Sequence, residues 1–232
     1  MVLPNGRSVT PSTGQNYKCP KCQDKGYIII NKDTLEIERC ECSIRAENMK
    51  RLKNSGLIDL VDQYTFEKFK TSEVWQMQAK EKAFAYLKAP KSAWFFIGGQ
   101  SGSGKTHLCT AMCTAMIESG KNLKYFKWRE DAPRLKALIN DADRYDAEMK
   151  KLSDIQVLYI DDFFKGLVSG GDINFAYQLL NDRYNTQRRT IISSEHDIES
   201  LMKIDEAIAG RIYERAKDFC ILTPERNYRF DG

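Results

Sequence analysis

The stretch AWFFIGGQSGSGKTHLCTAMCTAMIES, residues 93–119, decides the fold of this chain of 232 residues. An apolar strand runs into a glycine-rich loop, and a helix follows at once. Residues 99–106 match the pattern G-x4-G-K-[ST]. Glycines let successive backbone N–H groups turn toward one centre, and the following helix adds the positive end of its dipole. Because the loop stands between a strand and a helix, we predict that it binds the phosphates of ATP.

The loop residues have different predicted roles. Lys105 is expected to reach the β- and γ-phosphates, and the hydroxyl of Thr106 is expected to bind Mg²⁺. His107 directly follows the threonine, and a structural role is the alternative for it. The predicted nucleotide-binding residues of this segment are Gly99, Gln100, Ser101, Gly102, Ser103, Gly104, Lys105, Thr106 and His107.

A second apolar segment ends in two carboxylates, in IQVLYIDDFFKG at residues 155–166. Residues 157–160 predict a buried central strand that carries Asp161 and Asp162 at its C-terminal end, the edge at which open α/β sheets bind ligands. We expect Asp161 to hold Mg²⁺, directly or through water, and Asp162 to orient or deprotonate the attacking water. A pair of helix N-caps is the alternative interpretation of the two aspartates.

Three further apolar segments, at residues 122–128, 188–194 and 218–224, predict more strands. Helical periodicity is clearest in INFAYQLLNDRYNTQR, residues 173–188, between two of these strands. Strands that alternate with helices predict an α/β fold with a mostly parallel, doubly wound sheet.

Four of the seven cysteines lie in the first 42 residues, as Cys19-x2-Cys22 and Cys40-x-Cys42. Residues 27–30 and 35–39 predict two short strands around the turn NKDT, and such a hairpin brings both cysteine pairs together. Four thiolates suit a structural Zn²⁺ in a zinc-ribbon-like module, and so small a module depends on the metal for its folding energy. Unmetallated redox thiols are the alternative. The remaining cysteines, Cys109, Cys113 and Cys220, are expected in the core.

The composition limits the possible environments and partners. Hydrophobic residues make up 42% and charged residues 29%, and the net charge of +4 permits nucleic-acid binding without arguing strongly for it. No apolar run approaches the ~18 residues of a membrane span, and no signal peptide is apparent, so we expect a cytoplasmic protein. In LKYFKWRED, Lys127, Trp128 or Arg129 is expected to contact DNA, with burial of the aromatic residues as the alternative.

The loop at 99–106, the aspartates at 161–162, RTIISSEH at 189–196 and GRIYER at 210–215 occur in that order. Together they resemble the AAA+ ATPase core of DnaC/DnaI-type replicative helicase loaders, from about residue 60 onward. The cysteine segment resembles the N-terminal zinc region of the DnaI-like branch. The resemblance implies a five-stranded parallel AAA+ sheet, and the few residues after the last strand leave no room for a C-terminal helical lid. We expect a disordered tail (1–16), a zinc module (17–45), a linker helix (46–60) and an AAA+ ATPase domain (61–232).

The resemblance also implies roles for polar residues outside the phosphate loop. Arg215 of GRIYER is expected to be an arginine finger directed at the ATP of a neighbouring subunit, with Arg211 as a second candidate or a local brace. Ser194 or Glu195, after the fourth strand, is expected to contact the water or the γ-phosphate. Arg229 is expected to replace the sensing arginine of a lid, and a position at the surface is its alternative.

The function implied by the resemblance is ATP-dependent loading of a hexameric DnaB-type replicative helicase onto single-stranded DNA, with self-assembly on the helicase and ATP hydrolysis. An IstB-like transposase-helper ATPase that remodels DNA is the alternative. The cysteine module favours the loader, because it is typical of that branch. A metabolic P-loop kinase fits less well, since such an enzyme does not need an arginine finger.

Overall fold

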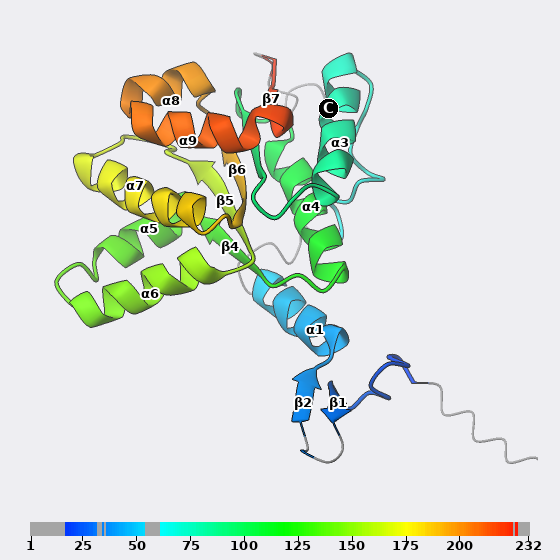
Figure 1. Cartoon of the computed structure of the whole chain (residues 1–232). Helices are drawn as coiled ribbons and strands as arrows, with labels where there is room; N and C mark the ends of the chain where they lie inside the picture. Colours follow the sequence, from blue (N-terminus) through cyan, green and yellow to red (C-terminus); the bar gives the residue numbers. More distant parts are fainter. Residues whose placement is uncertain (1–16, 32–33, 35, 54–60, 225, 227–232) are drawn as a thin grey trace, which may run out of the picture. The chain divides into compact units, whose positions relative to one another are not determined.

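A five-stranded sheet forms the centre of the larger of two units of the chain, and its strands run in the order β4-β5-β6-β3-β7 (Figure 1). Every pairing in it is parallel. Its strands are β3 (Trp94–Gly98), β4 (Leu123–Lys127), β5 (Val157–Phe163), β6 (Arg189–Ser194) and β7 (Cys220–Leu222). The predicted α/β fold with a five-stranded parallel sheet is therefore confirmed.

Helices cover both faces of this sheet, with α3 and α4 on one side and α5 to α9 on the other (Figure 1). They are α3 (Val74–Leu87), α4 (Lys105–Glu118), α5 (Trp128–Lys136), α6 (Ala142–Asp154), α7 (Gly170–Asn185), α8 (Ile198–Ile204) and α9 (Glu206–Ala216), and the 3₁₀ turn η2 (Lys217–Phe219) leads into β7. After β7, the residues that the structure describes contain no helix and thus no lid.

Side chains alternate along the strands, and both faces of the sheet are buried. On β3, Phe95 and Ile97 pack with α3 and α4, whereas Trp94 and Phe96 pack on the opposite face with α5 to α9. A strand covered on both faces is apolar at every position. This is why continuous apolar segments, rather than alternating ones, marked the central strands in the sequence.

The smaller unit extends to Ser43, and the larger one starts at Ile44. The computed structural model describes residues 17–31, 34, 36–53, 61–224 and 226, so the expected tail at 1–16 and part of the expected linker lie outside the described residues. The smaller unit contains the antiparallel hairpin of β1 (Tyr27–Asn31) and β2 (Glu36–Arg39). Helix α1 (Glu41–Leu52) begins within the second cysteine pair. None of the described helices is both long and apolar enough to cross a bilayer.

A buried arginine, Arg183 on α7, joins three elements of the larger unit. Its guanidinium donates to the carbonyls of Leu152, Ser153 and Ile155 at the end of α6, over 2.6, 3.2 and 3.0 Å. It also donates to β6, at the carbonyl of Arg189 and the hydroxyl of Thr190. The last carbonyls of a helix lack partners within the helix. Arg183 satisfies them for α6, and burial lowers its pKa to about 9.

We expect Arg183→Met to lower the free energy of unfolding by about 3–5 kcal/mol, because several buried carbonyls lose their donor at once. Urea unfolding followed by circular dichroism measures the change. Arg144→Met is the matched control, because that arginine lies on the surface of α6 with 71% of its side chain exposed. An equal and small loss in the two variants would contradict this account of Arg183.

Candidate nucleotide site and cysteine cluster

The phosphate loop connects β3 to α4 and rests on the segment after β7. Gly99, Gly102 and Gly104 have φ angles of 119°, 80° and 94°, in the left-handed region that favours glycine. A Cβ atom on Gly99 would lie 2.5 Å from Oγ1 of Thr223. Position 99 therefore requires glycine both for its backbone angle and for this close approach.

Lys105, at the start of α4, is buried beside the loop with 6% of its surface exposed. Its ammonium donates to the carbonyls of Gly99 and Gln100 over 2.7 Å each. Burial lowers the pKa of Lys105, although the charges of Glu195 and Asp162 oppose the shift. A buried ammonium of this kind gains stability when an anion binds beside it.

The cavity next to Lys105 has a volume of about 200 Å³. Its walls are formed by Tyr64, Ser101, Gly102, Gly104, Lys105, Thr106, His107, Asp162 and Lys165. Loop glycines, a lysine and the first residues of a helix thus face one space, which is the arrangement that binds phosphate groups.

The carboxylate of Asp161, at the end of β5, is buried and surrounded by hydroxyl groups. It accepts hydrogen bonds from Tyr159 at 2.6 Å, Tyr125 at 2.7 Å, Ser193 at 2.5 Å and Thr106 at 3.2 Å. Burial, together with the charge of Asp161, raises the pKa of both tyrosines, so they remain protonated donors. Sequence reasoning missed both tyrosines, because an aromatic residue in an apolar strand suggests only core packing.

Thr106 and Asp161 suit a magnesium ion, because Mg²⁺ prefers oxygen ligands and usually binds one or two carboxylates together with phosphates. The Thr106 hydroxyl that donates to Asp161 lines the phosphate cavity. A cation bound to that hydroxyl would therefore lie beside both the Asp161 carboxylate and the phosphates.

Asp162 lies in an irregular part of β5, where the register with β6 shifts between Ile160 and Phe163. Its φ angle of 55° is in the left-handed region, and strained angles of this kind are frequent at functional sites. Lys165 contacts Asp162 at 3.0 Å and Glu195 at 2.9 Å. Burial disfavours the charge of Glu195, but the hydrogen bond and the charge of Lys165 outweigh it and lower the pKa of this carboxyl.

Ser194 is placed differently from our expectation of a residue that contacts the water or the γ-phosphate. Its fully buried hydroxyl donates to the carbonyl of Phe163 over 2.7 Å and accepts from the backbone N–H of His196. Ser193 instead contacts Asp161, and it accepts from the backbone N–H of Asp162 at 3.2 Å. Ile160 pairs with Ile192, so the next residues, Asp161 and Ser193, lie side by side on one face of the sheet, and alternation along β6 turns Ser194 to the other face.

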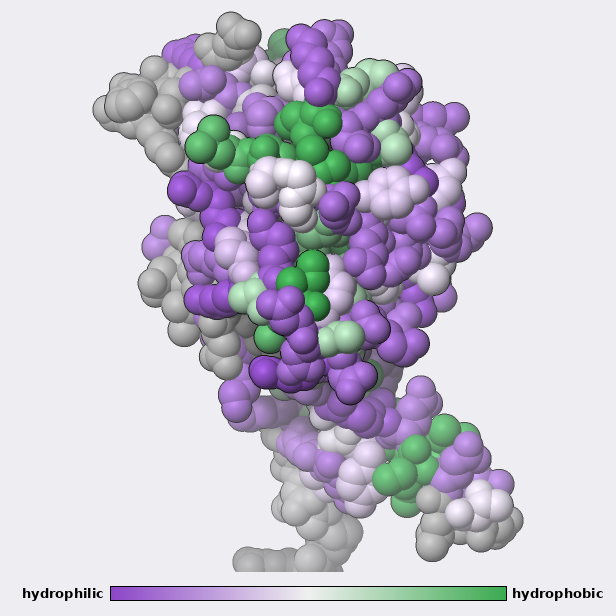
Figure 2. Space-filling model, turned by 90° about the vertical axis from the view of Figure 1, so that its left-hand side faces the viewer, coloured by the Kyte–Doolittle hydropathy of each residue, from purple (hydrophilic) through white to green (hydrophobic). Residues whose placement is uncertain are grey.

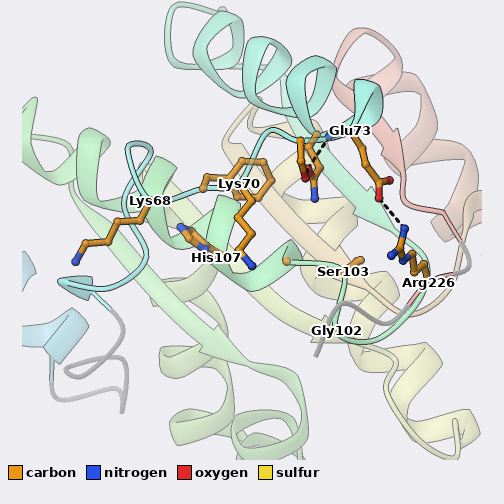
Figure 3. A pocket seen from close by; sticks show the side chains of 11 residues that line it. Lys68, Lys70, Glu73, Gly102, Ser103, His107 and Arg226 are labelled. Atoms are coloured by element: carbon orange, nitrogen blue, oxygen red, sulfur yellow. Dashed lines mark hydrogen bonds and ion pairs between the residues drawn. The ribbon is translucent and has the colours of Figure 1, made fainter. Parts of the chain in front are cut away.

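A larger pocket, of about 380 Å³, adjoins the phosphate cavity and shares Gly102, Gly104 and His107 with it (Figure 3). The ring of His107 stacks on Tyr64 and lies 2.9 Å from the carbonyl of Thr65. The remaining walls are Lys68, Phe69, Lys70, Ser72, Glu73, Gln76, Ser103 and Arg226. Apart from Ser103, these residues belong to no motif, so sequence reasoning missed most of this pocket.

Arg226 forms an ion pair with Glu73 at 3.0 Å on the wall of this larger pocket (Figure 3). Arg229, the expected substitute for a lid arginine, lies outside the described residues. Among the residues after β7 that the structure describes, Arg226 is the arginine that lines this pocket.

The two arginines of GRIYER lie on α9 and contact α7. Arg211 donates to the side chains of Asn181 and Tyr177 and to the carbonyl of Ala207. The guanidinium of Arg215 lies 4.3 Å from the ring centre of Tyr184. It donates to the Tyr184 carbonyl over 3.1 Å, and its buried Nε atom has no hydrogen-bond partner among the described residues.

The expectation that Trp128 contacts DNA is wrong. Trp128 begins α5 instead of extending β4, and its ring packs in the core against Phe163, Phe164 and Phe175 with only 4% exposed. Lys127 is half-buried and pairs with Glu130 at 3.2 Å, which leaves Arg129 as the exposed residue of the three. The alternative expectation, that the aromatic residues of this segment are buried, is thus correct for Trp128.

In the smaller unit, the sulfurs of Cys19, Cys22, Cys40 and Cys42 all lie within 4.8 Å of one another. The distances are 3.7 Å between Cys19 and Cys40 and 3.4 Å between Cys22 and Cys42. Zinc–sulfur bonds of about 2.3 Å in a tetrahedron place sulfurs about 3.8 Å apart, so the cluster suits Zn²⁺. In each of these contacts one cysteine precedes the hairpin and the other follows it, as the sequence predicted.

The close approach of the four sulfurs changes the pKa values of their thiols. A hydrogen bond from the Cys22 backbone lowers the pKa of Cys19 to about 7. Hydrogen bonds with the other three sulfurs raise the pKa of Cys42 to about 12. Four thiols this close together cannot all ionise unless a positive ion binds between them.

The parallel sheet, the phosphate loop and the buried Asp161 define a P-loop ATP-binding protein of the AAA+ class. The profile of the family described as IstB-like ATP binding protein matches residues 36–224. The chain belongs to this family, which includes DnaC-type AAA+ ATPases.

Individual relatives agree with this assignment. The chain is 29% identical over 242 residues to the phage-like element PBSX protein XkdC of Bacillus subtilis strain 168, covering 95% of this chain and 89% of the relative. It is 24% identical to the replicative helicase loader DnaC of Escherichia coli K12, over 75% of this chain and 71% of DnaC. A solved DnaC helicase loader is similar in fold, with a TM-score of 0.62 and 19% identity over 70% of this chain and 97% of that structure.

We expect one zinc ion per purified chain, and we expect a strong chelator to remove it and unfold the hairpin. Among the described residues 17–43 only Cys22 and Cys40 are buried, so the hairpin has no apolar core to keep it folded. Metal analysis and amide hydrogen exchange measure the two effects. Cys42→Ser should lose the zinc and Cys220→Ser, outside the cluster, should keep it. A metal-free chain with a fully protected hairpin would contradict the prediction.

Proposed function

We propose that this chain is an ATPase that loads a hexameric replicative helicase onto single-stranded DNA. The observation that carries the proposal is the combination of a phosphate loop beside the buried Asp161 with a separate four-cysteine unit. The likeness to the E. coli helicase loader DnaC supports it. The IstB-like description of the family supports a transposase-helper ATPase as the second candidate.

In this proposal ATP binds with its phosphates in the cavity beside Lys105 and its base and sugar in the adjoining larger pocket. Thr106 and Asp161 would hold Mg²⁺, which would supply positive charge to the phosphates. Asp162 and Glu195 are the carboxylates placed to orient a water molecule or to accept its proton.

The hairpin of the smaller unit is the proposed docking element for the helicase. Its isoleucines are exposed, with exposed fractions of 48% for Ile29, 59% for Ile30 and 62% for Ile37. Figure 2 shows hydrophobic residues gathered on this hairpin. An apolar surface on so small a module is typical of a protein-binding site.

Arg215 is the proposed finger, and Arg211 the local brace. The side chain of Arg211 uses its guanidinium for several bonds to α7 and α9. Arg215 has one such hydrogen bond and stacks on Tyr184, so fewer interactions must break before it can reach a neighbouring subunit.

Arg129 is the proposed contact to single-stranded DNA among the three residues expected from the sequence.

We expect Lys105→Ala to abolish helicase loading, because the phosphates lose their buried cation. The assay measures unwinding of a forked DNA by the host helicase when the single strand is coated with single-strand binding protein. Lys151→Ala, with 68% of its side chain exposed on α6, is the control and should load normally. If the unaltered chain does not stimulate unwinding but activates a transposase encoded nearby, the second candidate is correct.

We expect Arg215→Ala to bind ATP normally and to lower turnover in the assembled state by about 10³-fold or more, as for other arginine fingers. Mixing this variant with Lys105→Ala should restore part of the turnover. In that mixture a site with intact Lys105 meets an intact Arg215 from its neighbour. Arg134→Ala, an exposed arginine on α5, is the control. Absence of recovery in the mixture would contradict a finger that acts between subunits.

A further inference from the structure

Lys165 joins two carboxylates beside the phosphate cavity. Its ammonium lies 3.0 Å from Asp162 and 2.9 Å from Glu195, and the exposed fractions of the three side chains are 26%, 35% and 34%. Both carboxylates therefore share one cation in the structure, and this cation competes with water for them. Neither the family assignment nor the sequence motifs give Lys165 a role.

The backbone at Lys165 is anchored, while the side chain can rotate. The preceding residues, Phe163 and Phe164, are buried and stacked on each other at 4.1 Å. The Lys165 backbone N–H donates to the carbonyl of Asp162 over 3.0 Å. A lysine ammonium on its flexible four-carbon stem can reach different partners from a fixed Cα position.

The phosphate cavity offers Lys165 a second partner. Lys165 lines this cavity together with Lys105 and Thr106, the residues expected at the β- and γ-phosphates. While the Lys165 ammonium stays between the two carboxylates, their negative charge offsets its attraction for a triphosphate. That attraction rises if the ammonium turns toward the phosphate.

We propose that Lys165 senses the γ-phosphate of ATP. When ATP binds, the ammonium leaves Asp162 and Glu195 and pairs with the terminal phosphate, and both carboxylates become free to orient water. ADP has no γ-phosphate, so Lys165 remains between the carboxylates when ADP is bound. This inference rests on the proposed ATPase function and adds to it a residue that distinguishes ATP from ADP.

The test is isothermal titration calorimetry of the full chain with Mg·ATP and with Mg·ADP. Lys165→Met keeps the length of the side chain and removes its charge. We expect its affinity for ATP to fall about 10- to 100-fold, the effect of one charge-assisted hydrogen bond, while its affinity for ADP changes by less than about 2-fold.

Two further variants distinguish sensing from a structural role. Lys136→Met is the matched control, because Lys136 is also ion-paired, with Asp172, and 27% exposed, but it does not line the cavity. Both affinities should remain unchanged in it. Glu195→Gln removes one of the two carboxylates that compete for Lys165, so its affinity for ATP relative to ADP should rise.

Each outcome separates the inference from the proposed function. If the unaltered chain binds both nucleotides and Lys165→Met lowers both affinities equally or neither, Lys165 is a structural bridge and the inference is wrong. The proposed ATPase would then still stand. If the unaltered chain binds neither nucleotide, the proposed function and the inference both fail.

Discussion

The nucleotide site depends on the solvation of one buried charge, the carboxylate of Asp161. A buried anion is stable only if the protein supplies donors in place of water. Here the donors are hydroxyls from α4, β4, β5 and β6, on Thr106, Tyr125, Tyr159 and Ser193. One charge therefore holds the first turn of the phosphate-loop helix against three neighbouring strands, and it fixes the position at which a magnesium ion would bind.

Asp162, Glu195 and Arg215 are held in contacts that nucleotide and assembly would change in our account. Asp162 and Glu195 share the ammonium of Lys165, and Arg215 stacks on Tyr184 of its own chain. In our account, ATP releases the carboxylates and a neighbouring subunit receives the arginine. Hydrolysis would then require both bound nucleotide and assembly, which suits an enzyme that must act only on its target.

The sequence was sufficient for the five strands and for the convergence of the four cysteines, because local patterns of apolar residues and turns determine both. It was insufficient where a residue's role depends on tertiary packing. Trp128 and Tyr159 both lie in the core, yet only Tyr159 also donates a hydrogen bond to a carboxylate. Ser193, rather than the expected Ser194, contacts Asp161, because strand pairing decides which of two adjacent serines faces the site, and sequence patterns do not reveal that pairing.

The most direct test of the account is native mass spectrometry of the full chain mixed with the host's DnaB-type helicase, with and without Mg·ATP. The account predicts a discrete complex with the helicase hexamer whose stoichiometry changes with ATP. It also predicts that Cys42→Ser, which disrupts the proposed docking unit, abolishes the complex. If no complex forms either with or without Mg·ATP, the result would contradict a loader and favour the transposase-helper ATPase.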